Sequence, residues 1–204
     1  MLAAYVVLWL GYRMQWAWLH ALDIEAPRAL RGYGLGHPGW VRSWDILCAV
    51  LGPNGFRILG AVIIVFAMLQ RNPRVIVFLL ASIGLSGVVT EAAKRLADRP
   101  RPSSGLVYAM SSAFPSGHAV AVMTGVLALL TVTAGLLGGA LRVAALVTGA
   151  VVVIAIGFGR VALAVHYPSD VVAGWALGYL WFLGCLVVVR PRPLGSGRNT
   201  GSAR

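Results

Sequence analysis

Long apolar runs alternate with short polar segments along the chain, and this alternation predicts membrane-spanning helices. A helix needs about 20 apolar residues to cross the hydrocarbon layer. The clearest apolar runs cover residues 44–69, 75–93, 118–137, 143–165 and 170–189. An earlier run, residues 2–22, contains Arg13 and Gln15 and fits the pattern least well. We therefore expect an all-α, polytopic membrane helical bundle with about six transmembrane helices.

Proline and glycine interrupt this pattern at a few places. In the second run, Leu-Gly-Pro-Asn-Gly at 51–55 includes Pro53, which lacks a backbone donor and predicts a kink. Residues 23–42 are polar and contain glycine and proline, so they predict an external segment with room for a short surface helix. Gly174 and Gly178 have the spacing of helices that pack closely. Arg57 lies inside the second run, and the pattern gives it no role.

The composition supports a membrane protein. The chain is 59% hydrophobic and 11% charged, with a mean hydropathy of +0.82, which lies outside the range of soluble domains. No polar or low-complexity stretch divides it, so residues 1–190 form one predicted membrane domain. Residues 191–204 are basic and predict a disordered cytoplasmic tail that touches anionic headgroups. Cys48 and Cys185 lack metal or redox spacing and are expected to be packing residues.

The distribution of charge predicts the orientation better than the net charge of +11 does. A basic soluble nucleic-acid binder is excluded by the apolar runs, so no nucleic-acid partner is expected. With six spans, all acids fall on one side, and Arg71, Arg74, Arg142 and the basic tail fall on the other. We take the side without acids as cytoplasmic, although raw Lys and Arg counts favour the reverse. The N-terminus lacks a cleavable signal, so we expect the first run to be retained.

Three polar clusters are predicted to meet at one membrane face. They are Lys94 with Arg101 and Pro102; Pro115-Ser-Gly-His118; and Gly159, Arg160, His166 and Asp170. The predicted spans place all three clusters on the same side of the bilayer. Ionisable groups near the membrane core are costly, so convergence of several from separate loops indicates a functional site.

The cations of these clusters are suited to a group with several negative oxygens. Lys94, Arg101 and Arg160 could together form a phosphate pocket, because Arg offers paired donors and Lys a compact charge. The alternative for any single cation is that its side chain extends to the headgroups, and we expect this of Arg95 and Arg99. A pocket of cations would repel a divalent metal, so no metal and no cofactor is expected.

Ser116 and Gly117 stand where a loop enters a predicted helix. Their backbone N–H groups and the positive helix end could hold an anion. For Ser116 the side chain has two possible roles, as an ordinary helix cap or as a phosphate ligand.

The histidines suggest phosphoryl transfer. Pro168 favours a helix start that places Asp170 in the first turn, within reach of His166. A carboxylate on one ring nitrogen fixes the tautomer and leaves the other nitrogen free to attack. His118, from a different loop, could protonate the leaving oxygen and then activate water. His20 and His37 are expected to be exposed at the interface.

These residues resemble the motifs of the type 2 phosphatidic acid phosphatase superfamily: Lys-x6-Arg-Pro, Pro-Ser-Gly-His and Ser-Arg-x5-His-x3-Asp. All three spacings agree, and the similarity covers about residues 44–189. Gly159 replaces the serine of the third motif and puts that one phosphate contact in doubt. The resemblance implies the fold shared with the haloperoxidases of the superfamily. It also implies these roles: nucleophile His166, its partner Asp170, acid/base His118, and phosphate binders Lys94, Arg101, Ser116, Gly117 and Arg160.

The resemblance further implies a lipid phosphatase of the inner membrane. We favour a polyprenyl (undecaprenyl or decaprenyl) diphosphate as substrate, because the predicted site faces the extracytoplasmic side and the chain has little room for a separate headgroup-recognition domain. A phosphatidylglycerol phosphate or broader phospholipid phosphatase is the second candidate. Haloperoxidase chemistry fits poorly because those proteins are soluble. A non-catalytic lipid-phosphate scaffold or transporter is disfavoured by the complete set of His118, His166 and Asp170.

Overall fold

The structure is a computed structural model that describes residues 1–103 and 105–195. Within these residues every regular element is helical, as the sequence predicts. The elements in chain order are α1 (Leu2–Arg13), α2 (Ala17–Gly36), α3 (Pro38–Val50), α4 (Pro53–Leu69), α5 (Pro73–Leu79), the π-helical turn η1 (Leu80–Gly84), α6 (Ser86–Ala97), α7 (Gly117–Thr133), α8 (Gly139–Ala162) and α9 (Pro168–Val189).

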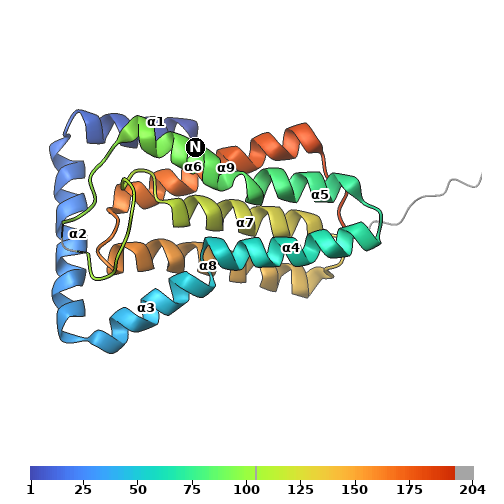
Figure 1. The fold of residues 1–204 in the computed structure, drawn as a ribbon, viewed down its shortest axis with the longest axis horizontal. Helices are drawn as coiled ribbons and strands as arrows, with labels where there is room; N and C mark the ends of the chain where they lie inside the picture. The colour runs from blue at the N-terminus through green and yellow to red at the C-terminus, as the bar shows by residue number, and fades with distance from the viewer. Residues whose placement is uncertain (104, 196–204) are drawn as a thin grey trace, which may run out of the picture.

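The long helices run side by side, and α2 lies across one end of the bundle, which we call the α2 end (Figure 1). Helix α7 is the inner helix and packs against α4, α6, α8 and α9. The loop between α6 and α7 folds over the α2 end, whereas the α4–α5 and α7–α8 turns lie at the opposite end. The ends of α6 and α8 and the starts of α7 and α9 therefore meet beneath α2.

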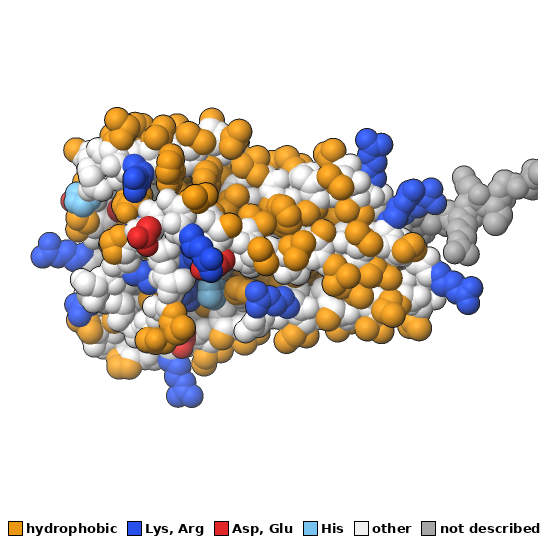
Figure 2. Space-filling view, turned by 45° about the horizontal axis from the view of Figure 1, so that its top comes forward, with side chains coloured by type: hydrophobic (Ala, Val, Ile, Leu, Met, Phe, Trp, Pro, Cys, Tyr) orange, Lys and Arg blue, Asp and Glu red, His pale blue; other side chains and the backbone are white. Residues whose placement is uncertain are grey.

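Four segments of the described chain are long and apolar enough to cross a membrane: Pro38–Leu69, Pro73–Ala97, Gly139–Ala162 and Pro168–Val189. Leu2–Arg13 and Gly117–Thr133 are shorter apolar helices. In Figure 2 hydrophobic side chains cover the middle of the molecule and basic side chains gather towards both ends. The chain is thus a multi-pass membrane protein, with the four long segments and the two short helices in place of six equal spans.

The predicted first span, residues 2–22, is wrong in its extent. Helix α1 ends at Arg13 and rises about 18 Å, too little to cross about 30 Å of hydrocarbon. Gln15 has a left-handed backbone (φ 53°), and the chain turns there into α2. The external segment therefore carries a helix of 20 residues rather than a short one. Its inward face repeats every four residues at Leu19, Asp23 and Pro27, which are buried.

The predicted break in the second run is confirmed. Helix α3 ends at Val50, and α4 begins at Pro53. Between them Gly52 cannot carry a side chain without a shift, because a Cβ there would lie 2.0 Å from the carbonyl oxygen of Cys48. The same Cβ would lie 3.0 Å from Cδ2 of His118, so the break brings the backbone against a predicted site residue.

The close packing predicted for α9 is also confirmed. A Cβ on Gly174 would lie 2.7 Å from the Ser116 carbonyl oxygen, and one on Gly178 would lie 2.6 Å from the Val120 carbonyl oxygen. The hydroxyl of Thr124 on α7 donates to the Gly178 carbonyl at 3.0 Å. These contacts pack α7 closely against α9 from the start of α7 to its middle, and the predicted site lies where both helices start.

The start of the predicted tail packs on the opposite end of the bundle. Leu194 is buried and its N–H donates to the Val132 carbonyl at 2.8 Å, while the Asn72 side chain donates to the Arg192 carbonyl at 3.1 Å. Residues 196–204 lie outside the described residues, so the disordered tail stays a prediction. Cys48 and Cys185 are both buried and unpaired, as expected of packing residues.

Candidate active site

A cavity of about 430 Å³ opens beneath the α2 end, between α3, α4, α6 and the loop before α7. The predicted site residues that line it are Lys94, Arg101, Gly117, His118, Arg160 and His166. Two more, Ser116 and Asp170, are buried behind its wall. The three sequence clusters therefore converge at one face, as expected from predicted spans that place all three on the same side of the bilayer.

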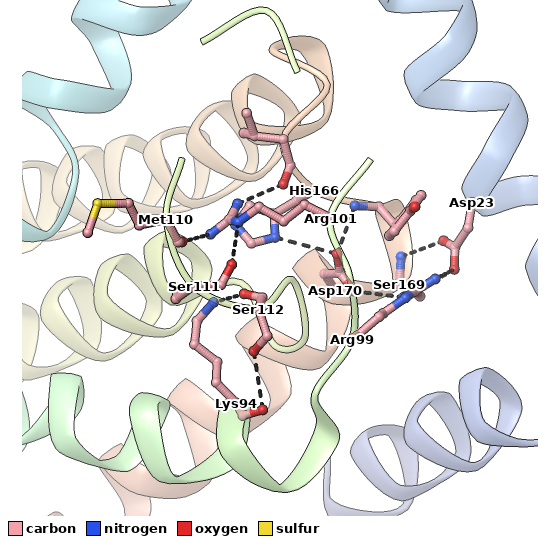
Figure 3. Close-up of polar contacts among 12 residues, drawn as sticks. Asp23, Lys94, Arg99, Arg101, Met110, Ser111, Ser112, His166, Ser169 and Asp170 are labelled. Atoms are coloured by element: carbon pink, nitrogen blue, oxygen red, sulfur yellow. Dashed lines mark hydrogen bonds and ion pairs between the residues drawn. The ribbon is translucent and has the colours of Figure 1, made fainter. Parts of the chain in front are cut away.

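His166 stands between the cavity and Asp170 (Figure 3). The imidazole is 1% exposed; its Nδ1 lies 3.4 Å from Oδ2 of Asp170 and its Nε2 lies 3.1 Å from Nη1 of Arg101. Asp170 sits in the first turn of α9, and its Oδ2 also accepts the Tyr167 N–H at 2.9 Å. The carboxylate thus faces one ring nitrogen, and the other ring nitrogen is on the side of the cations.

Burial and the nearby cations keep His166 neutral. Burial is the largest cause of a pKa well below the ordinary histidine value, and the positive charges of Arg101, Arg160 and Lys94 lower it further. A neutral imidazole has one nitrogen with a free lone pair, and a nucleophile needs that lone pair.

Three of the four Lys and Arg residues that line the cavity belong to the predicted motifs, and we call these three, Lys94, Arg101 and Arg160, the cavity cations. Arg101 donates to the backbone carbonyls of Ser111 (2.8 Å), Met110 (2.9 Å) and Val165 (2.7 Å).

The other two cavity cations also contact neutral groups. Lys94 donates to the Ser112 carbonyl, and Arg160 contacts the Cys48 thiol. In the described part of the chain none of the three makes an ion pair with a carboxylate. Their charge is therefore available to an anion.

The start of α7 offers fewer groups to an anion than the sequence predicts. The Ser116 N–H donates to the Asp170 carbonyl at 2.9 Å, so this N–H is occupied and cannot hold an anion as expected. The Ser116 hydroxyl makes no capping hydrogen bond and is buried without a partner. Gly117 does line the cavity, and a Cβ added to it would lie 3.9 Å from Cε of Lys94.

The packing around α8 explains why Gly159 departs from the motif. A Cβ at this position would lie 2.8 Å from Sγ of Cys48 and 2.9 Å from Cε3 of Trp44. Helix α3 thus fills the space that a serine would need, and its Cys48 contacts the neighbouring Arg160. Position 159 therefore offers no hydroxyl to a phosphate. The thiol of Cys48 lies beside this position and next to Arg160.

Sequence reasoning missed three buried residues, Asp23, Arg99 and Ser169, that form a hydrogen-bonded group with the predicted Asp170 behind His166. We call Asp23, Arg99, Ser169 and Asp170 the rear cluster; Figure 3 shows it on the side of His166 away from Lys94. Arg99 donates from Nη1 to Oδ1 of Asp170 and from Nη2 to Oδ2 of Asp23, both at 2.7 Å. Asp23 also accepts the Ser169 N–H (3.0 Å) and hydroxyl (2.6 Å).

The expectation that Arg99 extends to the headgroups is wrong. It is 6% exposed and its guanidinium lies over the rings of Tyr12 (4.7 Å) and Tyr167 (4.2 Å). Arg95, by contrast, is exposed and pairs with Glu91 at 3.2 Å. The sequence gives little signal for Asp23, because it lies two residues before Glu25 in a polar segment that predicts exposure.

Comparison with known proteins agrees with this geometry. Residues 75–193, more than half of the chain, match the model of the PAP2 superfamily. The chain belongs to the PAP2 superfamily. The match includes every predicted site residue of the three motifs, whereas Asp23 and α3 lie before it.

Two proteins similar to this PAP2 chain have names that state a phosphatase function. It is 28% identical over 116 residues to an undecaprenyl-diphosphatase of Sulfolobus acidocaldarius, and the aligned part is 53% of this chain and 52% of that one. The chain thus spans about half the length of this curated relative. The fold matches the crystal structure of a transmembrane PAP2-type phosphatidylglycerolphosphate phosphatase from Bacillus subtilis, with a TM-score of 0.67, 21% identity, and coverage of 91% and 96% of the two chains. This structure supports the shared fold.

Proposed function

We propose that the protein is a membrane lipid phosphatase that works through a phosphohistidine intermediate. The observation that carries the proposal is the position of His166, with Asp170 at Nδ1 and Arg101 beside Nε2 at the wall of a cationic cavity. Membership of the PAP2 superfamily and the name of the undecaprenyl-diphosphatase relative support the same reaction class. Residues 1–190 act as one membrane-embedded unit in this proposal.

The cavity cations bind the phosphate that is to be cleaved. Arg101 and Lys94 donate to backbone carbonyls, and a phosphate with several charged oxygens is a stronger acceptor than a neutral carbonyl. Arg160 approaches from α8 and Gly117 leaves space beside Lys94. Positive charge around the phosphate stabilises the extra negative charge of the transition state.

His166 then attacks phosphorus with the lone pair on Nε2. A bond forms between Nε2 and phosphorus as the bond from phosphorus to the leaving oxygen breaks. Asp170 holds the proton on Nδ1 and stabilises the positive charge that develops on the ring. The rear cluster holds Asp170 in place, so Arg99 and Asp23 act as positioning residues.

His118 moves the protons in both steps. The negative charge of the bound phosphate favours a proton on the His118 ring at the start. His118 gives this proton to the leaving oxygen and later takes one from the water that attacks phosphorus and releases His166. Its ring lies against the α3–α4 break and lines the cavity, on the α7 side. Replacement by Ala should therefore slow a substrate with a poor leaving group more than one with a good leaving group. Equal losses for both would contradict this role.

The substrate we favour is a polyprenyl diphosphate such as undecaprenyl diphosphate. The proposal places the α2 end on the extracytoplasmic side of the inner membrane, since basic residues without acids lie at the opposite end. A phosphatidylglycerol phosphate is the second candidate, because the matching Bacillus subtilis fold belongs to a phosphatase of that lipid. Both would use the same cavity, without a metal.

The test is a panel of lipid phosphates offered to the purified full-length protein. It should include a polyprenyl diphosphate, phosphatidylglycerol phosphate and phosphatidate, with released phosphate measured with and without a chelator. We expect release from the diphosphate, unchanged by the chelator. No release from any lipid would favour a transporter or scaffold, and loss of release in chelator would refute the metal-independent reaction.

A further inference from the structure

A fourth cation faces the cavity without a role in the chemistry above. Arg57 lies one turn into α4, within the membrane-spanning segment Pro38–Leu69, and lines the same cavity as His166. Its only hydrogen bond in the described residues is from Nη1 to Oδ1 of Asn54, at 3.1 Å. Arg57 is exposed and the neutral Asn54 amide does not balance its charge, so its guanidinium is available to an anion in the cavity that it lines.

The side chain of Arg57 crosses from α4 towards α6. Its Nη2 lies 3.2 Å from where a Cβ on Gly87 would be, so the glycine leaves room for the guanidinium. Gly87, Thr90 and Lys94 lie along one cavity-lining face of α6. Lys94 comes seven positions after Gly87 on α6, which places Arg57 about 10 Å further from the α2 end than the level of Lys94.

That depth matches the layout of a lipid with two phosphates. The cleaved phosphate lies at His166, and the lipid tail leads towards the membrane centre. Any second phosphate must lie between them, on the membrane side of the cavity cations. Lys94 and Arg57 line the cavity wall at the two ends of this interval. One phosphate alone cannot occupy both.

We infer that Arg57 is a specificity residue that binds the second phosphate of the substrate, the one that stays with the lipid after cleavage. This inference rests on the proposed function. The shared chemistry is a second anionic phosphate on the lipid side of the cleaved one. A diphosphate provides it directly bonded, and phosphatidylglycerol phosphate provides it one glycerol away.

The experiment compares Arg57→Gln with the parent protein on three substrates: farnesyl diphosphate, phosphatidylglycerol phosphate and farnesyl monophosphate. Glutamine keeps the length and hydrogen bonding but removes the charge. A lost charged hydrogen bond predicts a fall in kcat/KM of about 10-fold or more for a substrate with a second phosphate that reaches Arg57. For the monophosphate we expect a change below about 3-fold. The substrate with the larger fall identifies the source of the second phosphate.

Two variants complete the test. Arg74→Gln removes an exposed cation at the opposite end of the bundle and should leave all three rates unchanged. Arg57→Lys keeps the charge and should retain part of the preference even if the Gln variant folds poorly. Equal losses on the mono- and diphosphate, or no loss on any substrate, would overturn the role of Arg57. If the parent protein hydrolyses none of the three, the proposed function itself fails.

Discussion

The two charged groups on either side of His166 differ in how their charges are balanced. In the rear cluster Arg99 lies 2.7 Å from two carboxylates, Asp23 and Asp170. The cavity cations make no ion pair in the described part of the chain and donate to neutral carbonyls or contact a thiol. Complete buried ion pairs fix geometry, while cations without partners remain available to a ligand. The difference separates the residues that position the imidazole from those that bind phosphate.

The largest effect is expected at the residue between the two groups. His166→Ala removes the nucleophile, so kcat should fall at least about 10⁴-fold. The cavity cations remain, and binding of a non-hydrolysable diphosphonate lipid should persist in calorimetry. The exposed His20 is the matched control, and its replacement by Ala should not change kcat. Near-normal turnover by the His166 variant would refute the phosphohistidine pathway.

Removal of the rear cation should damage stability as well as rate. Arg99→Ala leaves Asp23 and Asp170 buried without a cationic partner, which should cost about 3–5 kcal/mol of the free energy of unfolding. Because the cavity cations stay intact, the variant should keep its KM and lose kcat. Thermal unfolding in detergent and a separate measurement of KM and kcat test both points. Arg99→Lys keeps the charge and should recover part of each. Unchanged stability would contradict the pairing.

A cavity cation should show the opposite pattern. Lys94→Gln removes one of several neighbouring positive charges, so the free energy of unfolding should stay the same or rise. The rate should fall by about 10²-fold, since a donor to the transition-state charge is lost. Parallel thermal melts of the Lys94 and Arg99 variants make the comparison. If Lys94→Gln destabilises the protein as much as Arg99→Ala does, the distinction between the two groups is wrong.

The smallest expected effect concerns pH. The folded state holds the pKa of His166 well below its ordinary value. As the pH falls through about 6.5, His166 therefore binds a proton in the unfolded chain but not in the folded chain. Stability from this group is complete above about pH 6.5 and is lost as the pH falls below it. Thermal unfolding should therefore depend less on pH between about 5 and 7 in His166→Gln. An identical pH dependence in parent and variant would contradict the lowered pKa.

The sequence predicts the cavity side of the site well, because each member belongs to a motif of fixed spacing. Lys94, Arg101, His118 and His166 lie in loops or helix ends that the apolar runs place on one side. Four of the spans follow from the length of their apolar runs alone. The break before Pro53 follows from its missing backbone donor.

The rear cluster could not be predicted in this way. Arg99 and Asp23 are 76 residues apart, and no periodic pattern links them. Arg99 stands at a variable position of the Lys-x6-Arg-Pro motif, where the sequence does not distinguish it from any interfacial cation. The extent of α1 was also missed, because the left-handed turn at Gln15 is set by the packing of α2 and not by the hydropathy of residues 2–22.

The position of Asp23 on α2 has a consequence for protein engineering. The family match begins at residue 75, so a truncation or chimera cut there would discard Asp23 along with the α2 helix that carries it. Arg99 would then keep only Asp170, and the N-terminus of α9 would lose the acceptor for its Ser169 N–H. Any minimal version of this enzyme must therefore retain the first 36 residues or supply a replacement carboxylate at the same place.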